Sequence, residues 1–91
     1  MDLQAFKISC RSVYPACVFN EYAGKITVST TWDGIIYYPV ALLEEIEGGF
    51  TNLFVVVCGG DYKHTRRFKP VCQEDFVKEL SKNKQVASCC I

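Results

Sequence analysis

The sequence of 91 residues has no apolar run long enough to cross a membrane. Its longest uninterrupted run, residues 53–58, is far shorter than the roughly 18 apolar residues that a membrane span requires. The first twenty residues also lack the basic start and apolar block of a secretory signal. Charge of one sign is not in excess either, because ten basic and ten acidic side chains cancel. We therefore expect a cytoplasmic, intracellular protein with no membrane partner.

Enzyme and metal signatures are missing as well. The sequence contains no Gly-x-Ser-x-Gly elbow, no phosphate-binding Walker loop, no dinucleotide fingerprint and no His-Glu-x-x-His pair. It has six cysteines but no Cys-x-x-Cys pair, and only one histidine. We expect no enzymatic activity, no cofactor and no metal, and we interpret the cysteines as small buried side chains in a reducing compartment.

What the chain does have is the composition of one globular domain. The sequence is 49% hydrophobic and 22% charged, and a chain of this length has only enough material for a single core. Its charge is unevenly spread. Residues 1–60 carry three basic and six acidic side chains, a net charge of −3, and residues 61–91 carry seven basic and four acidic ones, a net charge of +3. This polarity favours specific association or self-association over broad nucleic-acid binding.

Seven segments have the pattern of β-strands. Residues 53–58, rich in Val and Phe and closed by two glycines, predict a strand that is buried on both faces at the centre of the sheet. Alternation with a period of two is clearest in residues 26–32. The other expected strands are residues 6–11, 13–19, 35–38, 62–69 and 85–91.

Turn signals separate several of these strands. Asp33-Gly34 lies between two strand-forming segments and predicts a hairpin. Residues 20–25, with Gly24, and residues 59–61 predict two further turns. Because Pro15 cannot donate a backbone hydrogen bond, residues 13–19 are expected to form an edge strand. That edge is our candidate for a homodimer contact.

Two segments have the apolar spacing of helices. Residues 39–47 begin with a proline and place Leu42, Leu43 and Ile46 on one side. Residues 73–82 have acidic side chains in the first turn and lysines in the last. The expected element order is ββββ-α-ββ-α-β. It predicts one α+β domain over residues 1–91, with a mostly antiparallel sheet and both helices on its core face.

The segment of residues 62–69 holds four cations, the single histidine and two aromatic rings. In a strand, Lys63, Arg67 and Lys69 share one face, whereas Arg66 and the aromatic rings share the other. A surface that stacks nucleic-acid bases needs cations and rings together. This separation favours a protein partner over nucleic acid.

Exposed aromatic side chains give a second candidate binding surface. Trp32, Tyr37 and Tyr38 flank the expected hairpin turn at Asp33-Gly34, and such side chains often anchor interfaces. We therefore predict a small non-catalytic protein that binds another protein, in the manner of a regulatory subunit or of an inhibitor encoded by a virus or phage. Its predicted binding residues are Trp32, Tyr37, Tyr38, Lys63, Arg66, Arg67 and Lys69.

Two alternatives belong to other functional classes. The basic segment of residues 62–69 could form a nucleic-acid-binding module. Alternatively, Cys58, at the end of the expected central strand and close in sequence to His64, could be the nucleophile of a thiol enzyme. Against the thiol enzyme, no helix follows the glycines after Cys58, and the arginine of a phosphatase loop is replaced by His64.

Overall fold

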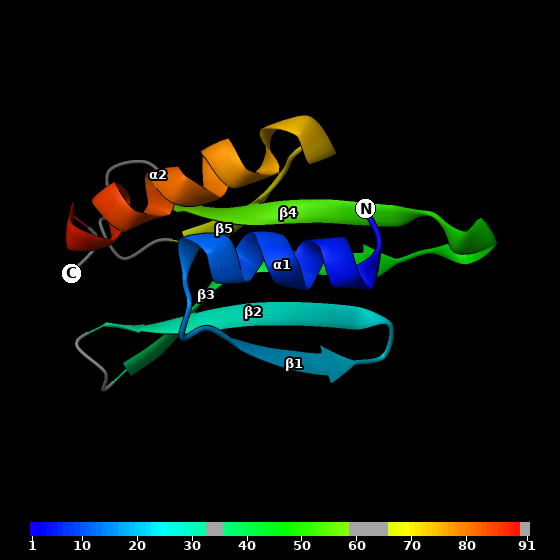
Figure 1. Ribbon diagram of the computed structural model, residues 1–91, viewed down its shortest axis with the longest axis horizontal. Coiled ribbons are helices and arrows are strands. Elements are labelled where there is room, and N and C mark those ends of the chain that lie inside the picture. Colours follow the sequence, from blue (N-terminus) through cyan, green and yellow to red (C-terminus); the bar gives the residue numbers. More distant parts are fainter. Residues whose placement is uncertain (33–35, 59–65, 90–91) are drawn as a thin grey trace.

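The protein is a five-stranded antiparallel sheet with two helices on one face (Figure 1). The computed structural model describes the backbone of residues 1–32, 36–58 and 66–89, and the side chains of residues 1–31, 37–57 and 67–82. The strands are β1 (Val18–Tyr22), β2 (Lys25–Trp32), β3 (Ile36–Glu45), β4 (Thr51–Cys58) and β5 (Arg66–Pro70), which lie in the sheet in chain order. The helices are α1 (Leu3–Val13) and α2 (Phe76–Cys89), with short 3-10 turns at Glu47–Gly49 and Gln73–Asp75.

This architecture confirms the α+β class and the mostly antiparallel sheet with two helices. The order of elements differs from the expected one. One helix precedes all five strands and the other follows them, so the chain reads α-βββββ-α. Within the described part of the chain, no helix is long and apolar enough to cross a membrane.

The first expected strand is in fact helix α1. Asp2 caps this helix by accepting a hydrogen bond of 2.8 Å from the backbone N–H of Ala5. The buried side chains of α1 are Phe6, Cys10 and Val13, at spacings of four and three. Residues four apart lie on one side in both a strand and a helix, which is why alternation at this site was misleading. Ile8 distinguishes the strand from the helix. In a strand it would share the buried face of Phe6 and Cys10, but its side chain is 66% exposed and so faces away from the core.

The segment predicted as the first helix, residues 39–47, is mostly strand β3. Strand β3 pairs with β2 on one side and with β4 on the other, so it, and not β4, is the middle strand. The register with β2 shifts between Val28 and Ser29, which leaves Val40 as an extra residue beside Pro39. A bulge of this kind accommodates a proline that lacks a backbone donor.

Three of the other predicted strands agree with the structure at least in part. Strands β2 and β4 contain the expected residues 26–32 and 53–58, and the end of the basic segment forms β5, antiparallel to β4 as predicted. Of the expected strand at residues 13–19, only Val18 and Phe19 are in a strand, because α1 continues to Val13 and residues 15–16 turn. The edge strand in this part of the chain is therefore β1, Val18–Tyr22, and β5 forms the other edge of the sheet. The predicted turns at 33–34 and 59–61 lie outside the described residues.

The second helix was predicted correctly but too short. A 3-10 turn covers residues 73–75, and α2 then runs to Cys89. The strand expected at residues 85–91 is wrong for residues 85–89, which continue α2, and residues 90–91 lie outside the described part. A helix here uses its own backbone hydrogen bonds and needs no neighbouring strand.

One core fills the space between the helices and the sheet. Phe6 of α1 lies 5.6 Å from the Phe76 ring of α2 and 6.3 Å from the Phe19 ring of β1, measured between ring centroids. Leu80 of α2 and Val55 of β4 are fully buried in the same cluster. The register gives each strand one set of side chains on this helix face and another on the opposite, open face.

Candidate functional site

The open face carries a group of apolar side chains that is separate from the core. Leu42 of β3, Phe54 of β4 and Pro70 of β5 are opposite one another across the three strands. Val56 and Phe68 are opposite each other in a second row. We call these five residues the open-face patch. None of them belongs to the cluster that α1 and α2 cover. Both described helices lie on the other face of the sheet (Figure 1).

Exposure varies across the open-face patch. Val56 is only 5% exposed although it is not part of the helix-face core. Leu42 and Phe54 are half-buried, and Phe68 is 42% exposed. Residues on the same face of adjacent strands shield one another, so the centre of the patch is already shielded while its border remains accessible. An apolar centre of this kind, on a sheet face that neither described helix covers, is typical of an interaction surface.

Polar side chains border the open-face patch on the β2 side. Thr27 is opposite Leu42 and is half-buried. Two residues further along each strand, Lys25 and Glu44 form an ion pair, with 3.5 Å between Nζ and Oε2. An apolar centre with a polar border is the usual arrangement of a protein interface.

The aromatic residues predicted to bind a partner are divided between the two faces. Tyr37 is opposite Thr31 on the open face and is 60% exposed. Tyr38 is opposite the buried Thr30 on the helix face, where it is half-buried and packs against the core. Trp32 is the last residue of β2, and its side chain lies outside the described part. Of the two tyrosines, Tyr37 alone lies on the same face as the open-face patch.

Two of the four predicted basic residues, Arg67 and Lys69, lie on the helix face. Arg67 is opposite Val57, and Lys69 is opposite Val55. Lys69 Nζ also lies 3.9 Å from a carboxylate oxygen of Glu79 on α2. Lys63 and the side chain of Arg66 lie outside the described residues. The described cations of β5 are thus turned away from the open-face patch.

The open-face patch was missed at the sequence level, although a signal for it exists. Residues 53–58 are apolar at every position and so present apolar side chains to both faces. Phe68 alternates with Arg67 and Lys69, which places its ring opposite Val56 on the face away from those cations. Two helices packed on one face cannot cover the other.

The described thiols are poor nucleophiles. Burial raises the pKa of Cys10 to about 12, and burial also raises the pKa of Cys17. Cys72 is exposed, but its Sγ donates a hydrogen bond of 3.1 Å to Asp75, and this bond raises its pKa. Cys58 ends β4, while its side chain and His64 lie outside the described residues. Within the described residues, no three His, Cys, Asp or Glu side chains gather where a metal could bind.

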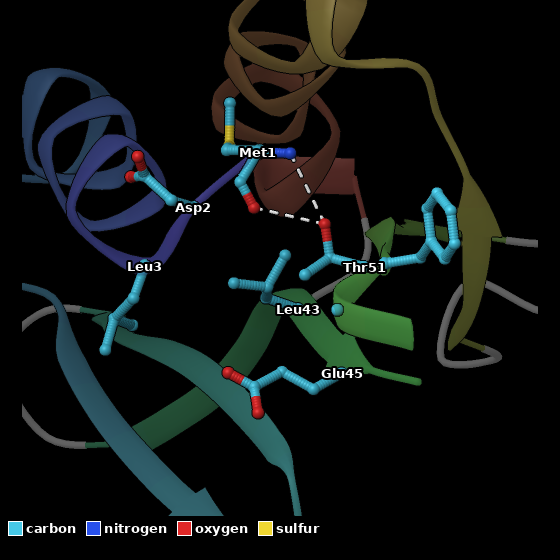
Figure 2. Close-up of a pocket in the computed structure, with 8 residues that line it drawn as sticks. Met1, Asp2, Leu3, Leu43, Glu45 and Thr51 are labelled. Atoms are coloured by element: carbon cyan, nitrogen blue, oxygen red, sulfur yellow. Dashed lines mark hydrogen bonds between the residues drawn. The ribbon is translucent and has the colours of Figure 1, made fainter. Parts of the chain in front are cut away.

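A hollow lies near the start of α1 and the beginning of β4 (Figure 2). Its volume is about 450 Å³, and its lining includes Asp2, Glu45 and Thr51. The Thr51 hydroxyl donates a hydrogen bond of 3.1 Å to the Met1 carbonyl and accepts one of 3.3 Å from the Met1 amine. Figure 2 shows these two bonds between Met1 and Thr51, which both line the hollow. The polar groups of Met1 and Thr51 therefore bind one another, and we assign no chemistry to this hollow.

Comparison of the chain with protein-family models, curated proteins and solved structures gives no match.

Proposed function

We propose that this protein is a small binding protein without catalytic activity, and that it contacts a protein partner through the open-face patch. The supporting observation is that Leu42, Phe54, Val56 and Phe68 form an apolar surface on the face that the helices leave open. Burying exposed apolar side chains is the main favourable term in protein association. Phe68 offers the most exposed aromatic ring of the patch.

The charge distribution on β5 favours a protein over nucleic acid as the partner. Nucleic-acid surfaces place cations beside the aromatic rings on which bases stack. Here the register places Phe68 on the open face together with one cation position of β5, that of Arg66, whereas Arg67 and Lys69 are on the helix face. The cation on the open face of β2, Lys25, is already paired with Glu44. An apolar protein surface is the more suitable partner for such a face.

The proposed role is that of a regulatory subunit or an inhibitor acting in the cytoplasm, as a virus- or phage-encoded inhibitor would. A compact binder of this size suits such a role. The cysteines Cys10, Cys17 and Cys72 are all free thiols, which is compatible with a reducing compartment.

The test compares two variants that each place an aspartate at an exposed apolar position. Phe68→Asp puts a charge into the open-face patch, and Ile8→Asp puts one on the exposed side of α1. Tagged wild type and both variants are incubated with lysate of the host cells in which the protein acts, with and without nuclease. We expect Phe68→Asp to reduce recovery of the bound protein by about tenfold or more. Binding would bury the aspartate carboxylate against the partner and remove its hydration, which is costly for an unpaired charge.

Ile8→Asp serves as the control and should recover as much partner as wild type. Circular dichroism and thermal unfolding of both variants verify that the fold is retained. If recovery survives Phe68→Asp, the open-face patch is not the binding surface. If nuclease abolishes recovery, the partner is nucleic acid, and the proposal is wrong.

A further inference from the structure

The two edges of the sheet differ in how well they are protected against pairing with another strand. Strand β5 carries Arg66, Arg67, Lys69 and Pro70, and charged side chains and proline are the usual means of blocking an edge. Strand β1 has the sequence Val-Phe-Asn-Glu-Tyr, with one charge and no proline. Four of its five residues are exposed, and β2 is its one neighbour among the described strands. Strand β1 is therefore the edge open to pairing.

The hairpin between β1 and β2 determines which backbone groups of β1 point outward. Ala23 and Gly24 both have positive φ, 51° and 78°, as a two-residue type I′ turn requires. The turn makes Tyr22 and Lys25 the first pair, which exchanges two backbone hydrogen bonds. Hydrogen bonding alternates along an antiparallel strand, so the N–H and C=O groups of Phe19 and Glu21 point away from β2.

We propose that a second copy of this chain binds at this edge, so that the two β1 strands pair antiparallel about a two-fold axis at Asn20. Phe19 of each copy then lies opposite Glu21 of the other. These are the residues whose backbone groups point outward, and the two pairs form four hydrogen bonds between the chains. A two-fold contact of this kind uses the same surface on both copies and forms a closed dimer.

Charge complementarity supports this register. The Lys7 ammonium lies 5.6 Å from the centroid of the Phe19 ring, and the Arg11 guanidinium lies 5.2 Å from it. Phe19 and Glu21 both project to the helix face, because they are opposite Val28 and Ile26 of β2. In the proposed dimer, Glu21 of the second copy lies beside Phe19, close to these two cations. The two-fold axis repeats the contact, so two carboxylates each meet two cations.

Apolar contact on the open face supports the same register. Val18 lies opposite Tyr22 of the second copy, and these side chains are 39% and 83% exposed in the isolated chain. An aromatic side chain opposite a β-branched one is a favourable pair across strands. Pairing thus covers the most exposed aromatic side chain of β1.

Other two-fold registers are less favourable. An axis at Glu21 would place the two Glu21 carboxylates opposite each other, and like charges at that position destabilise a strand pair. An axis at Phe19 would leave Tyr22 without a partner and would pair Glu21 with Cys17, which precedes the strand. The register centred on Asn20 pairs all five residues of β1.

Size-exclusion chromatography with light scattering, over a range of protein concentrations and with reducing agent present, tests the proposal. We expect wild type to form a dimer. Glu21→Lys should weaken the dimer by about tenfold or more, because a lysine would meet Lys7 and Arg11. The double variant Lys7→Glu/Arg11→Glu should weaken it similarly, and combining all three substitutions should restore it.

Glu74→Lys is the matched control, because it also reverses one exposed acidic charge but lies beside α2. It should leave the dimer unchanged. Circular dichroism verifies the fold of each variant, and if Glu21→Lys does not fold, the double variant and the triple variant still test the contact. A protein that stays monomeric at the highest concentration overturns the proposal. So does a dimer that is indifferent to these charge reversals. The open-face patch would remain testable with Phe68→Asp, which lies on β5.

Discussion

Phe6→Ala is expected to lower the free energy of unfolding by about 3–5 kcal/mol, the usual cost of truncating a fully buried phenylalanine. The Phe6 side chain has no exposed surface, and its ring lies against those of Phe19 and Phe76. Its removal would leave a cavity where α1, α2 and β1 meet. Urea unfolding followed by circular dichroism measures the loss.

Ile8→Ala is the matched control, and it distinguishes a helix from a strand. If residues 6–11 were a strand, Phe6, Ile8 and Cys10 would share one face, and truncating Ile8 would also be costly. In α1, Ile8 is 66% exposed, so the change should stay within about 0.5 kcal/mol. Equal losses for the two variants would contradict the helical assignment of this segment.

The N-terminal segment illustrates where local sequence patterns are ambiguous. Phe6 and Cys10 suit a period of two and a period of 3.6 equally well. The information that favours the helix was present in Asp2, a capping residue, and in Val13, seven residues after Phe6. An alternating run of six residues is too short to outweigh a cap and a third apolar position at helical spacing.

Strand β3 illustrates a different limit. Pro39, Leu42, Leu43 and Ile46 have the spacing of a helix, and nothing nearby in the sequence contradicts it. The segment is extended because it pairs with strands on both sides, so that Leu42 projects to the open face and Leu43 to the core. These pairings are not local, and propensity yields to such tertiary contacts.

The candidate site was predictable in part. Alternation along the basic segment correctly separated Phe68 from Arg67 and Lys69, because this depends only on the period of a strand. The separation of Tyr37 from Tyr38 follows from the same rule once their segment is known to be a strand. The convergence of Leu42 with Phe54 and Phe68 required the strand order, which the sequence did not supply.

Alkaline pH is expected to destabilise the protein, and Cys10 should account for a large share of the effect. Burial raises the pKa of this thiol from 9.0 to about 12 in the folded protein. Below pH 9 the thiol is protonated in both states and adds no pH dependence. Between pH 9 and 12 the unfolded chain releases the proton while the folded protein retains it, so stability falls as pH rises. The full difference corresponds to about 4 kcal/mol.

Urea unfolding at pH 8, 9.5 and 11, with reducing agent present, measures this dependence in wild type, Cys10→Ala and Cys72→Ala. Cys10→Ala removes the titrating thiol, so its stability should fall less steeply above pH 9 even though the cavity lowers its stability at pH 8. Cys72 is exposed, so Cys72→Ala should retain the slope of wild type. Tyr14, whose pKa burial also raises, contributes equally to all three proteins. The difference in slope therefore isolates the Cys10 thiol, and identical slopes for wild type and Cys10→Ala would show that this thiol is not shielded by α1 and the sheet.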